Sequence, residues 1–296
     1  MRYFSIVLII CLNITFAINK ISAQSAKEIM IKVDNIQRFS YSTTVQNIKL
    51  STSKYIVKDQ KMRFTEKPRV KLIQSVEKKG YGADKKDSRS LAIILEPISD
   101  KGVGTITFDY NDASKDADTW IYLPALSKVK RVISTKDDSD TSGSFFGSEF
   151  AIEDIENKKI DDFTYKILKE EIYDQRPTWV IESIPTEKKA KKSRYGKIVS
   201  WVDKERYTVI REDLYNHQGN LYKQLNRRNY VLVDNVWLSK KVTMNNLLTR
   251  RATFMDLESA AFNMDVSDEF LTQRALTDFS FREKNLDQVS AKLKKF

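Results

Sequence analysis

The chain has 296 residues, of which 51 are Lys or Arg and 40 are Asp or Glu, so its formal net charge is +11. This length allows one large domain or two small ones and suffices for a stable apolar core. With one cysteine, Cys11, and one histidine, His217, the sequence excludes a disulfide framework and any metal site built from several thiolates or imidazoles.

The first segment has the composition of a secretory signal peptide. A short charged start precedes an apolar run from Phe4 to Ile18, and the small residues Ser22 and Ala23 follow. Residues 1–23 are therefore predicted to be a signal peptide that is cut after Ala23. A retained membrane anchor is the less favoured alternative, because the run has marginal length for a span and contains polar residues.

Export changes what the remaining composition implies. Removal of residues 1–23 also removes Cys11, so the exported protein depends on its core alone for stability. In an exported protein the basic excess indicates an anionic membrane surface or an acidic partner, and we expect no nucleic-acid partner. The densest basic run, from Lys188 to Arg194, is typical of a solvated loop.

The pattern after the signal begins with a helix and then changes to strands. Ala26, Ile29, Val33 and Ile36 recur at helical spacing, which predicts a short amphipathic helix over Ala26–Arg38. From Phe39 onward the apolar period is two residues. The predicted strands are Ser40–Leu50, Ser53–Asp59, Lys61–Thr65, Val70–Glu77, Leu91–Leu95, Thr105–Tyr110, Phe163–Glu170, Thr178–Ile184, Tyr195–Val202, Tyr207–Leu214, Leu221–Asn226, Tyr230–Val233, Val236–Leu238, Lys241–Asn246 and Thr253–Leu257.

The stretch from Asp118 to Val132 contains a strand followed by a basic strand. Trp120 and Tyr122 share one face of the first strand, and Pro124 ends it because proline cannot donate to a neighbouring strand. The second strand carries three cations among apolar residues: Lys128, Lys130 and Arg131.

A polar loop, Ser134–Ser144, then leads to the adjacent pair Phe145 and Phe146. One interpretation is that the pair anchors the loop in the core. The other is that the loop is a lid whose apolar tip contacts a hydrophobic ligand. Periodicity alone favours the anchor.

These elements predict a mainly β fold. Many consecutive antiparallel strands have short connections, and helical patterns are confined to the start, to an insertion after Phe150 and to the end, after a helix cap at Ser267. This order favours a large antiparallel sheet, curled or closed, over alternating βαβ units. The sheet would span residues 24–296 as a single domain, and its concave side needs helices, a ligand or both.

The sequence offers little for catalysis. His217 lies beside a predicted hairpin turn, no Gly-x-Ser-x-Gly elbow is present, and Gly143–Ser148 lacks the end of a phosphate-binding loop. Glu153 and Asp154 are expected to be solvated. We therefore expect no enzyme activity, no cofactor and no metal site, with a hydrolase that uses His217 as an open alternative.

Aromatic residues on sheet faces are the remaining signal. Their ordinary role is core packing, but in an incompletely filled curled sheet some would line an apolar cavity suited to acyl chains. The set comprises Trp120, Tyr122, Trp179, Trp201 and Trp237.

The central motif resembles the outer membrane lipoprotein-sorting family, in its LolA-like branch associated with RND-type exporters. The resemblance rests on Trp120–Pro124, Lys130–Val132 and Ser144–Phe150, with Glu153 and Asp154 behind them. It extends over about Leu91 to Leu276. Two positions depart from the family pattern but keep its charge: Glu149 replaces Asp and Lys130 replaces Arg.

The resemblance implies an unclosed antiparallel barrel of the LolA/LppX type, with a few helices on its concave side. It also implies export to the periplasm and a non-covalent carrier of lipid or lipidated protein that works with an RND/MMPL-type exporter. The different class that stays open is a non-carrying accessory or scaffold subunit of an inner-membrane exporter.

The sequence and the resemblance together predict where ligands bind. Trp120, Tyr122, Phe145 and Phe146 are predicted to form the cavity or its lid around acyl chains. Three cations are predicted to contact a lipid head group, the membrane surface or the exporter: Lys128, Lys130 and Arg131.

Overall fold

A computed structural model describes residues 24–59, 61–132 and 143–296, and it begins with a capped helix, α1 (Ala26–Phe39). The predicted signal peptide and most of the predicted loop Ser134–Ser144 lie outside the described residues. The Oγ of Ser25 accepts from the backbone N–H of Glu28, and the carboxylate of Glu28 accepts from the N–H of Ser25. This reciprocal cap fixes the start of the helix, and the predicted helix is confirmed.

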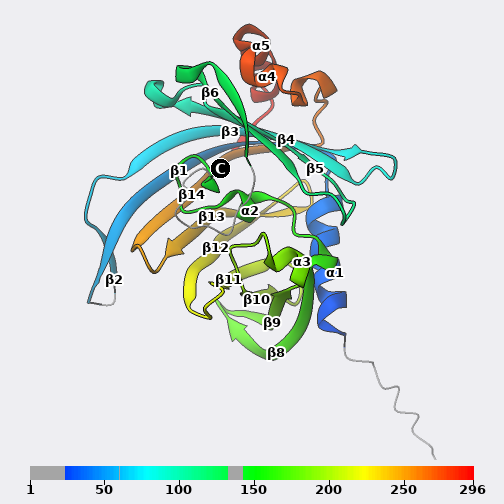
Figure 1. The fold of residues 1–296 in the computed structure, drawn as a ribbon, viewed down its shortest axis with the longest axis vertical. Helices are drawn as coiled ribbons and strands as arrows, with labels where there is room; N and C mark the ends of the chain where they lie inside the picture. Colours follow the sequence, from blue (N-terminus) through cyan, green and yellow to red (C-terminus); the bar gives the residue numbers. More distant parts are fainter. Residues whose placement is uncertain (1–23, 60, 133–142) are drawn as a thin grey trace, which may run out of the picture.

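All the strands of the described chain belong to one antiparallel sheet. Its path runs β7-β6-β5-β4-β3-β1-β14-β13-β12-β11-β10-β9-β8, with β2 attached to β1 and β15 to β14 (Figure 1). The strands are β1 (Thr43–Lys58), β2 (Lys61–Phe64), β3 (Arg69–Tyr81), β4 (Asp87–Glu96), β5 (Gly104–Asp109), β6 (Asp118–Leu123), β7 (Lys128–Val132), β8 (Phe163–Tyr173), β9 (Arg176–Pro185), β10 (Lys197–Asp203), β11 (Val209–Tyr215), β12 (Leu221–Val233), β13 (Val236–Asn246), β14 (Arg251–Phe262) and β15 (Lys294–Lys295).

The sheet is curled and open. Its path ends at β7 and β8, which do not pair with each other in the described residues. Figure 1 shows the strands arching from β6 over the top of the molecule and down to β8. The predicted large antiparallel sheet, forming an unclosed barrel, is confirmed.

The two faces of the sheet carry separate apolar clusters, which β4 illustrates. Leu91 and Ile93 pack with the C-terminal helices, whereas Ala92 and Ile94 pack with residues of the concave side. Side chains alternate along a strand, so each strand in this half of the sheet serves both clusters. The sheet is therefore the middle layer here and not a shell with water on one side.

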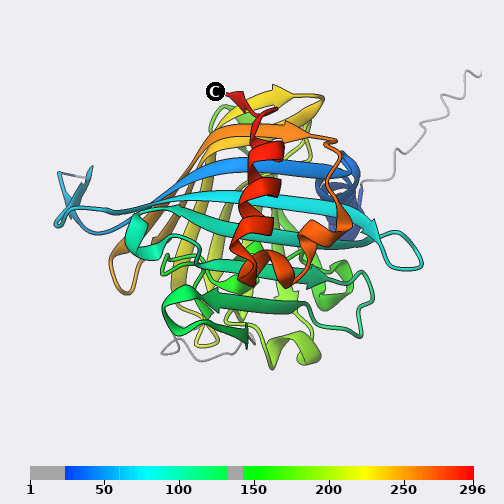
Figure 2. The same cartoon turned by 90° about the horizontal axis from the view of Figure 1, so that it is seen from above.

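Helices cover both faces. The concave side holds α1, whose Ile29 and Val33 pack with β9 and β10, and α2 (Ile152–Ile155). The convex side holds α4 (Arg274–Thr277) and α5 (Phe279–Ser290), which cross the strands in Figure 2. The expectation of helices on the concave side thus applies to α1 and α2, and the C-terminal pair is an addition to it. The remaining short helices are α3 (Glu187–Ala190), η1 (Ile98–Asp100), η2 (Pro124–Leu126), η4 (Ile160–Asp162) and η5 (Asp268–Leu271).

Candidate functional site

A tight turn over residues 144–151 occupies the concave side of the sheet. The N–H of Phe145 donates to the carbonyl of Phe150 at 2.8 Å, and the Ser144 hydroxyl donates to the carbonyl of Ser148 at 2.7 Å. Phe146 and Gly147 both have positive φ, 51° and 73°, so the backbone reverses there in a conformation that glycine adopts at little cost. Gly147 and Ser148 therefore close this turn.

The turn places both phenylalanines in the core of the concave side. Each is 6% exposed, and their ring centroids lie 4.4 Å apart. Their neighbours in the cluster include Leu50 of β1 and Ile94 of β4. In this structure both rings pack in the core, and most of the loop that precedes them lies outside the described residues.

Glu149 fastens the turn to the sheet. Its carboxylate accepts from Arg251 Nε at 2.7 Å and from Asn246 Nδ2 at 2.9 Å, and its carbonyl accepts from Lys223 Nζ at 2.8 Å. Its N–H donates to the Thr253 hydroxyl at 2.9 Å. One residue of the turn thus bonds to β12, β13 and β14, which explains why a carboxylate stands at this position of the motif.

An acidic group lies beneath the turn, against the β10 side of the sheet. Glu153 accepts from the N–H of Arg194 at 3.0 Å and forms an ion pair with Lys189 at 3.2 Å. Asp154 accepts from the Tyr195 hydroxyl at 2.8 Å, and burial raises the pKa of Asp154. The expectation that Glu153 and Asp154 are solvated is wrong, because Glu153 is buried and Asp154 is held by internal donors.

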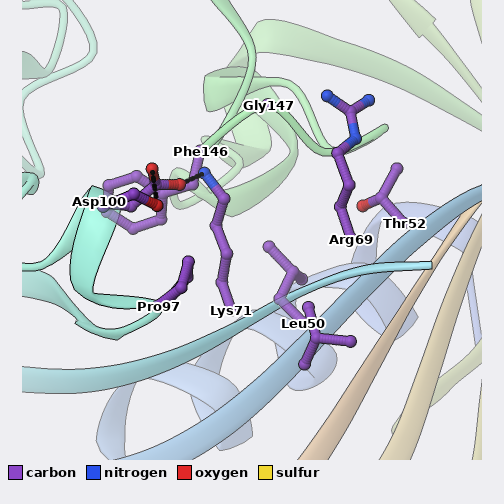
Figure 3. Close-up of a pocket in the computed structure, with 10 residues that line it drawn as sticks. Leu50, Thr52, Arg69, Lys71, Pro97, Asp100, Phe146 and Gly147 are labelled. Carbon is purple, nitrogen blue, oxygen red and sulfur yellow. Dashed lines mark hydrogen bonds and ion pairs between the residues drawn. The ribbon is translucent and has the colours of Figure 1, made fainter. Parts of the chain in front are cut away.

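A cleft of about 450 Å³ opens beside the turn. This volume falls within the range of roughly 300–1,000 Å³ that is typical of ligand pockets. Apolar side chains and two cations share its walls (Figure 3). The lining residues are Leu50, Thr52, Arg69, Val70, Lys71, Pro97, Ser99, Asp100, Phe146 and Gly147.

The two cations of the cleft differ in their pairing. Lys71 Nζ lies 2.7 Å from Asp100 Oδ2, and this contact lowers the pKa of Asp100. Arg69 is exposed and forms no ion pair with the described part of the chain (Figure 3). Because Thr52 is opposite Arg69 and Leu50 is opposite Lys71, all four side chains point to the same face of the sheet. Arg69 is therefore a cation that an anionic group in the cleft can reach.

The predicted cavity residues do not all converge on this cleft. Phe146 lines it, and Phe145 packs directly behind Phe146. Trp120 and Tyr122 pack in the cluster of the opposite face, with Trp120 lying 5.1 Å from the Phe108 ring, centroid to centroid. The sequence correctly pairs Trp120 with Tyr122, but the structure places them on the other side of the sheet from the phenylalanines.

The three predicted head-group cations lie on β7, an edge strand. Arg131 forms an ion pair with Asp118. Lys128 and Lys130 are exposed, and both lie on the face opposite to Tyr122, since Lys130 is opposite Ile121 and Val129 is opposite Tyr122. None of the three lines the cleft, so any contact they make is made at the edge of the sheet.

His217 has a structural contact. Its Nε2 lies 2.8 Å from the carbonyl oxygen of Ser193, which can only accept, so this nitrogen carries the proton and ties two loops together.

Within residues 24–59, 61–132 and 143–296, no group of three or more His, Cys, Asp or Glu is arranged to hold a metal ion. None of the helices in these ranges has the length and apolar character needed to cross a membrane.

Arg69 and Lys71 are functional candidates that the sequence did not single out. They alternate with Val70 and Leu72 on an ordinary strand pattern, and nothing local distinguishes them from other basic strand residues. Only the register of β3 against β1 and the return of the chain at Phe146 bring them to the cleft. No signal in the sequence would have found them.

Comparisons with known proteins agree with this architecture. A family model described only as that of an uncharacterized protein matches residues 86–278, and no curated protein matches. A crystal structure of a putative outer membrane lipoprotein-sorting protein domain from Vibrio parahaemolyticus superposes with a TM-score of 0.73 at 24% identity, over 85% of this chain and 98% of that one.

Two further crystal structures share the fold. A DUF1329 family protein from Desulfovibrio piger has a TM-score of 0.73 and 24% identity, over 85% of this chain and 97% of its own. A LolA superfamily protein from Nitrosomonas europaea has a TM-score of 0.61 and 19% identity, over 84% of this chain and 98% of its own. The expected resemblance to the lipoprotein-sorting proteins is confirmed.

Proposed function

We propose that this chain is an exported, non-covalent carrier of lipid or lipidated protein. The chain belongs to the family whose model covers residues 86–278, and it has the LolA-like fold of the outer membrane lipoprotein-sorting proteins. It would act in the periplasm, after removal of residues 1–23, together with an RND-type exporter. Its action needs no covalent chemistry, because a carrier only has to shield hydrocarbon from water.

The observation that carries this proposal is the mixed chemistry of the cleft. Leu50, Pro97 and Phe146 offer apolar surface, while Arg69 offers an exposed cation that forms no ion pair with the described part of the chain. An amphiphile with an acyl chain and an anionic head group matches both parts. Its chain would lie against Phe146, at the entrance to the concave side, and its head group would lie at Arg69.

Burial alone can supply the affinity. Each methylene removed from water contributes roughly 0.8 kcal/mol, so about ten methylenes contribute ~8 kcal/mol before the cost of immobilising the ligand. This burial free energy alone corresponds to a dissociation constant of about 1 μM, and the cost of immobilising the ligand makes the binding weaker than that. A carrier needs binding of this moderate strength, because it must also release its cargo.

The filled interior favours a second candidate. Phe145, Phe146, Phe150 and Ile152 close most of the concave side, so a cargo larger than the cleft requires the turn to move. If neither the cleft nor a displaced turn admits lipid, the protein is the non-carrying accessory or scaffold subunit of an inner-membrane exporter. The two candidates differ in whether lipid co-purifies with the folded protein.

Native mass spectrometry and solvent extraction of the purified protein test the carrier. We expect bound acyl lipid in the wild type and its loss in Ser99→Trp, because Ser99 is exposed and lines the cleft, so that an indole there fills the mouth. Ser280→Trp, at an exposed position of α5, is the matched control and should retain the lipid. Lipid-free wild type that also takes up no fluorescent fatty acid would establish the accessory role instead.

A further inference from the structure

We propose that a projecting hairpin, made of residues 54–58 and 61–70, docks on the surface of an anionic lipid bilayer. We call it the docking hairpin. It comprises the end of β1, the whole of β2 and the first residues of β3. The inference goes beyond the carrier role, because it concerns how the protein meets a membrane and holds whether or not the cleft is loaded.

The docking hairpin extends beyond the rest of the sheet. The pairing of β1 with β14 ends at Lys54, and its pairing with β3 ends at Thr52. The next residues, Tyr55–Lys58, form a strand pair with β2, and at the base of the hairpin the N–H of Tyr55 also donates to the carbonyl of Arg250 at 2.9 Å. Figure 2 shows this ribbon projecting away from the body of the molecule at the left of the view. A two-stranded ribbon that projects from a sheet is marginally stable in water, so exposed apolar side chains on it indicate a partner outside the monomer.

One face of the docking hairpin is apolar and open. Directly opposite residues share a face, which groups Tyr55 with Phe64 and Val57 with Met62. Val57 is 66% exposed, Phe64 is 45% exposed and Met62 is 38% exposed. The Phe64 ring packs edge-on against Phe254 of β14 at 5.4 Å, which continues this apolar face onto the sheet.

The other face of the docking hairpin carries most of its positive charge, together with one exposed isoleucine, Ile56, which is opposite Arg63. Lys58 and Lys61 are directly opposite each other, and like charges at such positions destabilise a strand pair. Arg63 follows on the same face, 3.7 Å from Asp59. Lys54, Lys67 and Arg69 add further exposed positive charge near the base. An external anion would remove the repulsion between the paired lysines, so the charges indicate an anionic partner.

An anionic bilayer surface fits both faces at once. Apolar side chains at the tip can enter the boundary between head groups and acyl chains, and long Lys and Arg side chains can reach the phosphates from there. Each cation near such a surface strengthens binding. The base of the hairpin is continuous with the cleft, because Arg69 and Val70 line it. Docking would therefore bring the mouth of the cleft next to the lipid.

Flotation of the purified protein with vesicles tests the inference. We expect the wild type to float with vesicles of phosphatidylglycerol and phosphatidylcholine, to remain unbound with phosphatidylcholine alone, and to be released by salt. Val57→Ser combined with Phe64→Ser should lower partitioning about tenfold, and Lys58→Glu combined with Lys61→Glu should lower it at least as much. The substituted side chains are exposed, so the variants should keep the wild-type circular dichroism spectrum.

Matched controls come from exposed positions elsewhere. Ile172→Ser removes a 72% exposed isoleucine from the β8–β9 hairpin, and Lys284→Glu combined with Lys292→Glu reverses two exposed lysines near the C-terminus. Both should bind vesicles like the wild type. The inference is overturned if the wild type does not float, if it binds neutral vesicles equally, or if controls and hairpin variants lose binding alike. The inference is also overturned if the wild type binds no vesicles and the hairpin variants instead lose the capture of a protein partner.

Discussion

The carboxylate of Glu149, in the turn on the concave side, lies 2.7 Å from the Nε of Arg251 at the start of β14. Both side chains are mostly buried, at 10% and 21% exposed respectively. Glu149→Ala should therefore destabilise the protein by roughly 2–4 kcal/mol, because Arg251 and Asn246 lose an internal acceptor. Urea denaturation measures the change. Glu149→Asp, which keeps the charge, should cost less, and an equal loss in both variants would argue against the carboxylate contact as the cause.

Removal of the Phe145 ring should destabilise the protein through packing. Phe145→Ala empties a site that is 6% exposed, and such changes cost about 3–5 kcal/mol. Phe279→Ala, at a 56% exposed phenylalanine of α5, should cost under about 1 kcal/mol. Thermal unfolding of the two variants checks the difference. Similar melting temperatures for both would contradict the anchoring role of Phe145.

Stability should fall as the pH rises from about 5 to 8. Burial raises the pKa of Glu156 to about 8, far above its ordinary value, so the folded state keeps a proton that the unfolded chain has already lost. Where the folded state binds more protons, stability decreases with rising pH. Burial also raises the pKa of Glu77 and of Asp109, which act in the same direction.

Glu156→Gln isolates this contribution. The amide cannot ionise, so the variant should exceed the wild type in stability by about 1–3 kcal/mol at pH 8, and the gap should close near pH 5. Denaturation at several pH values measures it. A gap that is constant with pH would show that Glu156 does not titrate in this range.

Trp120 should matter for folding and not for cargo. It packs with Phe108 on the convex side, away from the cleft. Trp120→Ala should cost about 2–4 kcal/mol of stability and leave the amount of extracted lipid per folded protein unchanged. Quantitative lipid extraction after refolding checks this. A loss of lipid comparable to that in Ser99→Trp would restore Trp120 to the binding site.

The exposed lysines of β7 lie at the edge of the sheet and away from the cleft, where the proposed exporter contact would be made. Lys128→Glu combined with Lys130→Glu should weaken capture of an RND-type exporter from membranes and leave vesicle flotation unchanged. These lysines have no ion pair in the described chain, so stability should stay within about 0.5 kcal/mol of the wild type. Pull-down with the wild type as reference measures the effect, and undiminished capture would exclude β7 as the contact.

Local patterns were sufficient for most of the secondary structure. The spacing at residues 26–38 predicts the helix that the structure has. The predicted strands Tyr230–Val233 and Val236–Leu238 leave Asp234 and Asn235 between them, and in the structure both residues have positive φ and form the connecting turn. The sequence pattern predicts two short strands in places where the structure has one long strand. Tyr230–Val233 continues from Leu221–Asn226 as β12 because a single irregular residue, Asn229 with positive φ, lets the ribbon bend without ending.

The site was harder to predict, because it depends on contacts between distant residues. Alternation shows that Trp120 and Tyr122 share a face, but it does not show which layer covers that face. The C-terminal helix α5 decides this, and the helical pattern expected near the chain's end does not show which face of the sheet it covers. In the same way, the approach of Phe146 to Arg69 is set by the register of β3 and by the Glu149 contacts, neither of which leaves a local signal.

The seam between β1 and β14 has a consequence for the order of assembly. β1 and β14 are neighbours in the sheet, but almost all of the other strands lie between them in the sequence. Almost every other pair of neighbours in the path is consecutive in the sequence. A chain synthesised from its N-terminus would hold the long β1 with an unsatisfied edge until the last large strand arrives. Chains cut short before Arg251 should therefore aggregate through that edge, and a chaperone that shields it would be needed until synthesis is complete.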